Sequence, residues 1–159
     1  MQPTPDNDQL KQTQVLSDNP VWLDNFINIY QSLAIDNLAS LAQLYHQDIT
    51  FEDPLHVING FSDLAAYFDN LYLHVTRCDF VIDQVIHTGN QAGIYWTMTY
   101  VHQHLNSGEA ITVQGHSLIM GDNDKVVYHR DYIDLGQMLY ENVPVLGAII
   151  RWLKRRINQ

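Results

Sequence analysis

A change in the spacing of apolar residues after residue 75 limits the fold of this chain more than any other feature. Before that point apolar side chains recur at helical spacing, whereas four later segments alternate apolar and polar residues as strands do. The connections HTGNQ, NSGE and GDND are short, polar and rich in turn-forming residues. Long strands joined by tight turns predict an antiparallel meander. We expect its strands at residues 76–87, 92–105, 110–120 and 126–134.

Helical patterns precede the meander. Asn19 and Pro20 fit an N-cap and a first helical position, and apolar residues follow at helical spacing to Leu33. A second, short helix follows residue 36, and a third follows Gly60. Helices before a meander predict an α+β fold, in which a cone-shaped, curved antiparallel sheet is wrapped by the N-terminal helices as in a cystatin-like roll. The open end of such a cone is a natural pocket.

The length and composition fit one domain with two different ends. We expect residues 1–16, which are polar and rich in Gln, Asp and Thr, to form a disordered tail. Residues 17–136 are expected to form the domain, and residues 137–159 a C-terminal amphipathic helical extension. Its apolar residues oppose a basic cluster, so it either packs on the domain or a second subunit or lies on a membrane surface. The short apolar stripe and the acidic remainder of the chain argue for packing and against a membrane.

Charge and side-chain chemistry exclude several classes of partner. The net charge is −10, and half of the Lys and Arg residues lie within 151–156, so the remainder repels nucleic acid. The single cysteine, Cys78, allows no internal disulfide, which fits a reducing, cytoplasmic location. His102 and His104 have a metal-site spacing, but no third ligand is fixed by spacing, so we expect no metal. Without a Gly-rich phosphate loop, no nucleotide cofactor is expected either.

The stretch ITFEDP places a carboxylate on the apolar side of a strand. Ile49 and Phe51 alternate with polar residues, so Asp53 follows on their face. This carboxylate either caps the turn at Pro54 by accepting backbone N–H bonds or acts as a base in a pocket. His56 follows around the same turn, and we expect it at the pocket mouth.

The last hairpin gathers further ionisable groups. If GDND is a four-residue loop, His116 faces His129, and Asp131 lies on the same face, diagonal to His116. These three residues form either a buried polar network that fixes the hairpin or a group that transfers protons. The same alternation predicts the other pocket-facing residues, which are Phe51, Trp96, Met98, Tyr100, Gln114, Leu118 and Ile133.

Four stretches over roughly residues 20–135 resemble the SnoaL-like and ketosteroid-isomerase-like branch of the nuclear transport factor 2 superfamily: FINIYQSL, ITFEDP, GHSLIMGDNDKVV and YHRDYIDL. In ketosteroid isomerase, an Asp before Pro at a strand end is the general base. A Tyr on the first helix and a protonated Asp in the sheet bind the developing oxyanion. The resemblance implies that Asp53 is the base and Tyr30 the first donor, with His116 in place of the second, acidic donor.

The resemblance implies a protein with a pocket for a small apolar ligand, and two functions fit it. In the first, a cofactor-free isomerase or related enzyme uses Asp53 to take a proton next to a carbonyl group. Tyr30 and His116 steady the enolate, while Asp131 and His129 tune or relay the proton. In the second, the protein is a non-catalytic ligand-binding or dimerisation module. Members of this family commonly pair through sheet faces, so a homodimer is expected in both cases.

Overall fold

The structure, a computed structural model, describes residues 18–33 and 35–157. The tail predicted for residues 1–16 lies outside the described residues. One sheet contains the strands in the order β2-β1-β6-β5-β4-β3. They are β1 (Tyr45–Glu52), β2 (Val57–Asn59), β3 (Val75–Thr88), β4 (Gln91–His102), β5 (Ile111–Asp122) and β6 (Lys125–Ile133). The α-helices are α1 (Val21–Gln31), α2 (Leu41–Leu44), α3 (Phe61–Tyr72), α4 (Leu135–Met138) and α5 (Leu146–Ile157), with short 3₁₀ helices η1 (Ile35–Ser40), η2 (Asn106–Gly108) and η3 (Tyr140–Asn142).

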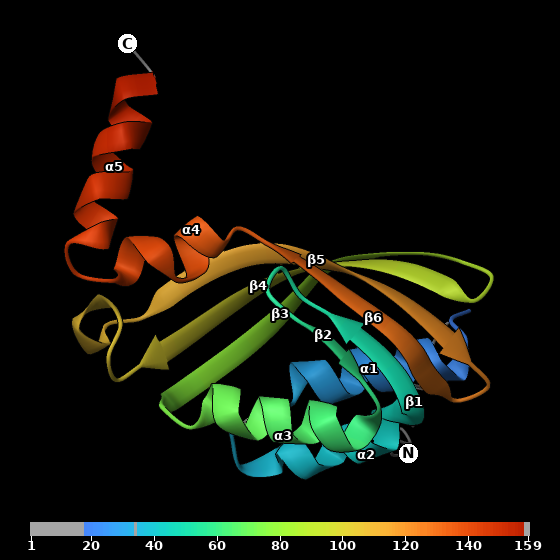
Figure 1. Cartoon of the computed structure of the whole chain (residues 1–159). Coiled ribbons are helices and arrows are strands. Elements are labelled where there is room, and N and C mark those ends of the chain that lie inside the picture. Colours follow the sequence, from blue (N-terminus) through green and yellow to red (C-terminus); the bar gives the residue numbers. More distant parts are fainter. Residues whose placement is uncertain (1–17, 34, 158–159) are drawn as a thin grey trace, which may run out of the picture.

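The helices α1, α2 and α3 cover one face of the curved sheet, and the opposite face is open (Figure 1). This arrangement confirms the predicted α+β fold with a curved sheet and N-terminal helices. The pairing of β1 with β6 is parallel, whereas every other pairing in the sheet is antiparallel. Since β1 lies beside β6, the stretch ITFEDP and the last strand end at the same edge of the cone.

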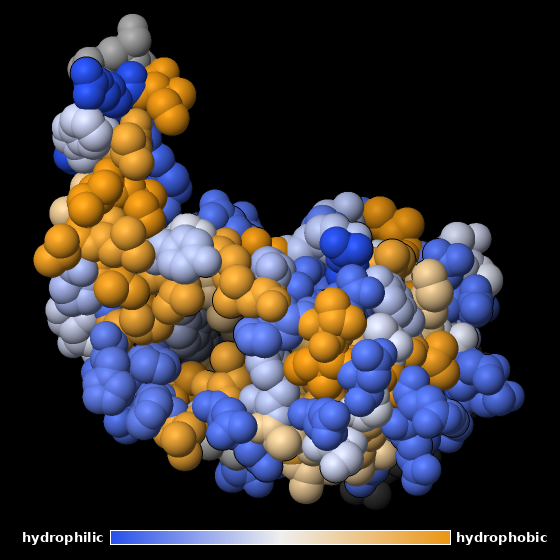
Figure 2. Space-filling model, in the orientation of Figure 1, coloured by the Kyte–Doolittle hydropathy of each residue, from blue (hydrophilic) through white to orange (hydrophobic). Residues whose placement is uncertain are grey.

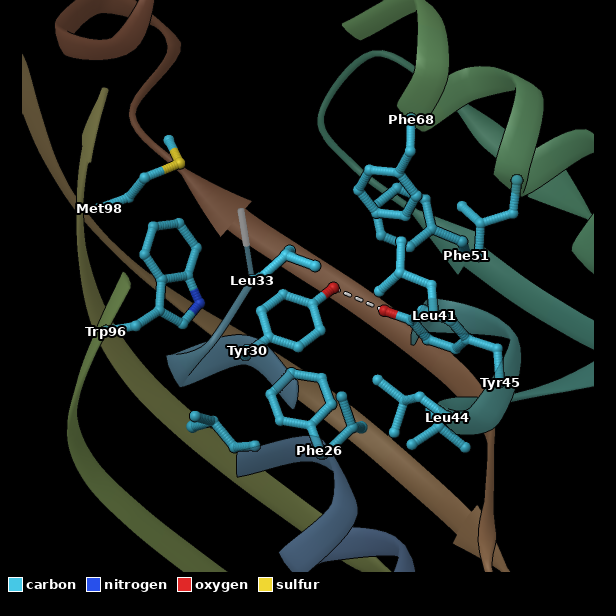
Figure 3. Packing of buried hydrophobic residues seen from close by; sticks show 14 of the residues in the cluster. Phe26, Tyr30, Leu33, Leu41, Leu44, Tyr45, Phe51, Phe68, Trp96 and Met98 are labelled. Carbon is cyan, nitrogen blue, oxygen red and sulfur yellow. Dashed lines mark hydrogen bonds between the residues drawn. The ribbon is translucent and has the colours of Figure 1, made fainter. Parts of the chain in front are cut away.

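The core lies between the helices and the concave face of the sheet. Phe26 and Tyr30 of α1 are buried there and stack with ring centroids 4.2 Å apart. Alternate residues of β4, including Trp96 and Met98, point toward them because successive side chains of a strand face opposite sides. Figure 3 shows these residues around the Tyr30 ring, whose hydroxyl points to the hydroxyl of Tyr45 and bonds with it. The aromatic core therefore encloses two hydroxyl groups, one from α1 and one from β1.

The register predicted for the final hairpin is wrong. The sequence suggests a four-residue turn, but Asp122 pairs with Lys125, so the turn has two residues, and a bulge adds one unpaired residue, Val127, to β6. His116 therefore pairs with Tyr132 rather than with His129, three positions away. Because side chains alternate along a strand, this odd offset turns His116 to the opposite face of the sheet.

The C-terminal helix α5 leaves the body of the protein (Figure 1). Its base is held to η3 by a salt bridge from Lys154 to Glu141 and by a hydrogen bond from Arg151 to the Glu141 carbonyl oxygen, 2.9 Å long. Its large apolar side chains are 40–83% exposed, except for Ile150, which is partly buried. The apolar stripe of this helix is therefore not packed on its own domain, which was one of the three arrangements considered from the sequence. No helix in the described part of the chain is long and apolar enough to span a membrane.

A glycine in β5 allows the close approach that sets the position of Trp96. A Cβ atom added at Gly115 lies 2.4 Å from the Trp96 ring, whereas one added at Gly93 has no atom within 4 Å. We predict that Gly115→Ala lowers the free energy of unfolding by about 1–3 kcal/mol, because the indole must move. Urea denaturation measures this change, and Gly93→Ala is the matched control. Equal stability of the two variants would contradict the packing described for Trp96.

Candidate functional site

A cavity of about 270 Å³ opens on the concave side of the sheet. Its wall combines residues of α1, α3 and α4 with residues of β3, β4 and β6 and of the turn after β1. Most of the lining is aromatic or aliphatic, and it includes two carboxylates, Asp53 and Asp131. A concave, mainly apolar site with a few polar groups is typical of small-molecule binding.

The structure brings together most of the residues that the sequence assigned to a pocket. The cavity is lined by Tyr30, Phe51, Asp53, His56, Trp96, Met98, Tyr100, Asp131 and Ile133. His129 is fully buried behind this wall. Gln114, His116 and Leu118 lie on the opposite face of β5. There His116 stacks between Tyr132 and Tyr95, with ring centroids 4.6 and 5.4 Å away. His116 therefore does not reach Asp53 or Tyr30.

Asp53 is held by hydrogen bonds within its own turn and from α3. Its carboxylate accepts bonds from the backbone amides of Leu55 and His56, each 2.7 Å long, and from the Tyr67 hydroxyl at 2.5 Å. The His56 ring lies 3.1 Å from both carboxylate oxygens. Burial acts to raise the pKa of Asp53, but these hydrogen bonds outweigh it and hold that pKa below the ordinary value. The geometry favours the capping interpretation over that of a base.

Asp131 and His129 form the center of a second, more buried group. His129 Nε2 lies 2.8 Å from Asp131 Oδ1, and the Ser117 hydroxyl donates to the same oxygen at 2.5 Å. Ser117 in turn accepts the indole N–H of Trp96 at 2.9 Å. The other carboxylate oxygen of Asp131 has no hydrogen-bond partner among the described residues. One oxygen is thus fixed by two neighbours while the carboxylate, 18% exposed, lines the cavity.

The buried group continues through His129 to α1. The second ring nitrogen of His129, Nδ1, lies 2.7 Å from the Tyr45 hydroxyl, which lies 2.6 Å from the Tyr30 hydroxyl. When Asp131 is ionised and His129 is neutral, Nε2–H donates to Asp131, Nδ1 accepts from Tyr45, and Tyr45 accepts from Tyr30. Burial raises the pKa values of both tyrosines well above normal, and the Asp131 charge adds to the effect. Both phenols therefore stay protonated and act as hydrogen-bond donors.

Three residues of this arrangement were not predicted from the sequence. Tyr45 falls on the apolar stripe of a predicted helix, yet it begins β1. Ser117 shares the inner face with Asp131 only in the observed register. Tyr67 fits the apolar stripe of α3, and its sequence position carries no sign that its hydroxyl meets Asp53.

The cavity has no preformed metal site in the part of the chain that the structure describes. His102 lines the cavity and lies beside His74 and His104, with ring centroids 5.0–5.9 Å apart among the three. Burial and the two neighbouring imidazoles lower the pKa of His102. These rings form an edge of the open end rather than part of the buried hydrogen-bonded chain.

Residues 26–129 match the sequence profile of the SnoaL-like domain. The match covers more than half of the chain and ends two residues before Asp131. A comparison with curated proteins gives no match.

Solved structures share the fold at low sequence identity. A protein proposed to be a SnoaL-like polyketide cyclase from Jannaschia sp. CCS1 is 12% identical, with a TM-score of 0.68 over 79% of this chain and 96% of that one. A nuclear transport factor 2-like protein of unknown function from Burkholderia pseudomallei K96243 is 13% identical, with a TM-score of 0.70 over 80% and 100%. A protein with a ketosteroid-isomerase-like fold from Catenulispora acidiphila DSM 44928, solved with trimethylamine, is 14% identical, with a TM-score of 0.67 over 79% and 95%. At these identities the likeness concerns the fold.

The hydrogen bonds to Asp53 predict how acid affects stability. Because its pKa is lower in the folded than in the unfolded chain, ionised Asp53 stabilises the fold above the unfolded value of about 4. This contribution is lost as the pH falls through the folded pKa. We predict that Asp53→Asn loses less unfolding free energy than the wild type between about pH 5 and pH 2. Urea denaturation across this range tests the prediction, and parallel losses in both proteins would refute it.

Proposed function

Because the chain belongs to the SnoaL-like family, we propose that it binds a small apolar carbonyl compound in the cavity and moves a proton at the carbon beside the carbonyl group. The apolar wall suits the carbon skeleton of such a ligand. Asp131 is the proton acceptor in this proposal, and His129 and Ser117 position it. Asp53 keeps the turn after β1 in place at the cavity mouth.

The hydrogen bonding of Asp131 carries this proposal. A carboxylate is costly on an apolar wall unless it is paired or used, and only one of its oxygens is occupied by Ser117 and His129. The other oxygen is available to a proton of a bound ligand. Asp53, by contrast, accepts bonds on both oxygens, and its lowered pKa makes it a weaker base.

Tyr30 is the proposed neighbour of the ligand on the α1 side. It lines the cavity, and its link through Tyr45 to His129 ties its position to that of Asp131. Its raised pKa keeps it protonated, so it does not accept a proton from carbon. Its single O–H is donated to Tyr45, so it donates a hydrogen bond to a ligand oxygen only by giving up that bond. We propose that Tyr30 and Asp131 together orient the carbonyl compound.

A non-catalytic ligand-binding module is the alternative, and the phenols of the cavity favour it. Four tyrosine hydroxyls on the wall already bond within the protein: Tyr30 to Tyr45, Tyr67 to Asp53, Tyr72 to Cys78 and Tyr100 to the Met138 carbonyl oxygen. An enolate gains most from donors that are free and already aimed at its oxygen. A cavity whose donors are already engaged is able to bind a ligand without lowering the barrier to reaction.

Hydrogen exchange on a bound ligand distinguishes the two functions. A thermal-shift screen of apolar ketones and enones identifies binders, and NMR in D₂O then follows deuterium entering beside the carbonyl group. We predict exchange with the wild type and a rate at least about a hundredfold lower with Asp131→Asn. Two control variants should retain most of the exchange rate: Asp53→Asn at the cavity mouth and His116→Ala on the outer face of the sheet.

The outcomes separate the alternatives. Exchange that is undiminished in Asp131→Asn would rule out the assigned base. Binding to the wild type without exchange would support the non-catalytic module, provided that Asp131→Asn still folds and binds the same compound.

We also propose that the protein forms a homodimer through the open face of the sheet. Val81, Ile86, Tyr95 and Tyr132 expose apolar surface there, and no helix covers this face in Figure 1. Two such faces of identical chains can pair around a twofold axis. We predict that Tyr95→Glu converts the dimer to a monomer in light scattering after gel filtration, whereas Leu73→Glu, exposed at the end of α3, does not. A monomeric wild type would rule out this assembly.

A further inference from the structure

The helix α5 presents a continuous apolar stripe that its own chain leaves uncovered. Leu146, Ile149, Leu153 and Ile157 recur at the spacing that puts side chains on one side of a helix. They are 40–83% exposed, although such residues are usually buried. Figure 2 shows these hydrophobic side chains along the projecting helix. Exposure of this kind marks a surface that binds something outside the domain.

Cationic side chains flank the stripe and indicate the chemistry of what binds it. Four of the twelve residues of α5 are Arg or Lys, and none is acidic. Lys154 pairs with Glu141, whereas Arg155 and Arg156 form no salt bridge with any described residue. The Arg156 guanidinium lies 5.1 Å from the center of the Trp152 ring, which is half exposed beside the stripe. Long cationic side chains beside Trp and aliphatic residues suit a lipid headgroup region.

We propose that α5 docks in the plane of an anionic lipid surface, with its apolar stripe in the acyl region and its cations among the headgroups. Charge complementarity favours this occupant over a second α5, because two helices of this kind would bring eight like charges together. The acidic remainder of the chain repels the same surface. At physiological salt charges farther than about 8 Å apart are largely screened, and α5 projects from the body of the protein (Figure 1), so its cations reach the surface while most of the acidic side chains stay beyond that distance.

Docking of α5 has a consequence for the cavity. The helix contacts η3, which follows α4 in the chain. Leu135 and Met138 of α4 line the cavity. The Tyr100 hydroxyl bonds to the Met138 carbonyl oxygen and holds α4 against the sheet. A bound α5 therefore brings this wall of the cavity close to the bilayer, where apolar compounds concentrate. Lipid binding itself does not depend on any activity of the cavity.

Vesicle co-sedimentation with the full chain tests the proposal. The probes are phosphatidylcholine vesicles with or without about 30% phosphatidylserine. We expect the protein to bind the mixed vesicles. Its affinity should be at least about tenfold lower for vesicles of pure phosphatidylcholine, and it should fall by a similar factor when the salt concentration rises from about 50 to 500 mM. Emission of the half-exposed Trp152 should shift to the blue on binding, and Trp152→Phe should remove this shift.

Matched substitutions test whether vesicle binding depends on the apolar stripe of α5 or on exposed apolar residues anywhere on the surface. Leu153→Asp should reduce vesicle binding at least about tenfold. Leu73→Asp, which changes an exposed leucine directly after α3, should not. Circular dichroism checks that both variants fold. No binding of the wild type to anionic vesicles would overturn the proposal, as would equal binding by Leu153→Asp. Dissociation of a lipid-free dimer by Leu153→Asp, together with absent vesicle binding, would assign the stripe to a second copy instead.

Discussion

A fully buried histidine that must form hydrogen bonds at both ring nitrogens constrains the rest of this structure. His129 is 0% exposed and lies among aromatic rings, so an unpaired nitrogen there would cost stability. Tyr45 supplies one partner from β1 and Asp131 supplies the other from β6 itself. The parallel pairing of β1 with β6 brings Tyr45 within reach, and Tyr30 of α1 completes the chain. This chain of hydrogen bonds thus joins α1, β1 and β6, and it places the carboxylate of Asp131 at the cavity.

The two carboxylates of the cavity differ because their surroundings differ. Asp53 accepts several hydrogen bonds at the end of β1 and is stabilised as a turn cap with a lowered pKa. One carboxylate oxygen of Asp131 bonds to both Ser117 and His129, and the other has no hydrogen-bond partner among the described residues. Neighbours rather than residue type therefore assign different roles to two aspartates in one site. The proposed base is therefore Asp131 on the last strand rather than Asp53 in the turn after β1.

Local patterns predicted the elements of the fold, and long-range geometry decided the site. The alternation after residue 75 and the helical spacing before it were enough for the α+β architecture. The face of each residue in the last hairpin depended on a one-residue bulge in β6, because the shorter turn alone shifts the pairing by two positions and keeps His116 on its predicted face. Tyr45 was missed because four helical residues precede it, too few to show where the helix ends. Amphipathic spacing likewise predicted the helix α5 but not that its apolar stripe is left exposed by its own domain.

The protonation state of His129 tests most directly whether Asp131 is an ionised acceptor in the cavity. A long-range ¹H–¹⁵N correlation spectrum near neutral pH, with the His129 signals assigned by their loss in His129→Gln, reports which ring nitrogen carries hydrogen. The account predicts a proton on Nε2, donated to Asp131, and a bare Nδ1 that accepts from Tyr45. A proton on Nδ1 with a bare Nε2 would contradict it, because Asp131 would then have to be protonated in order to bond to His129.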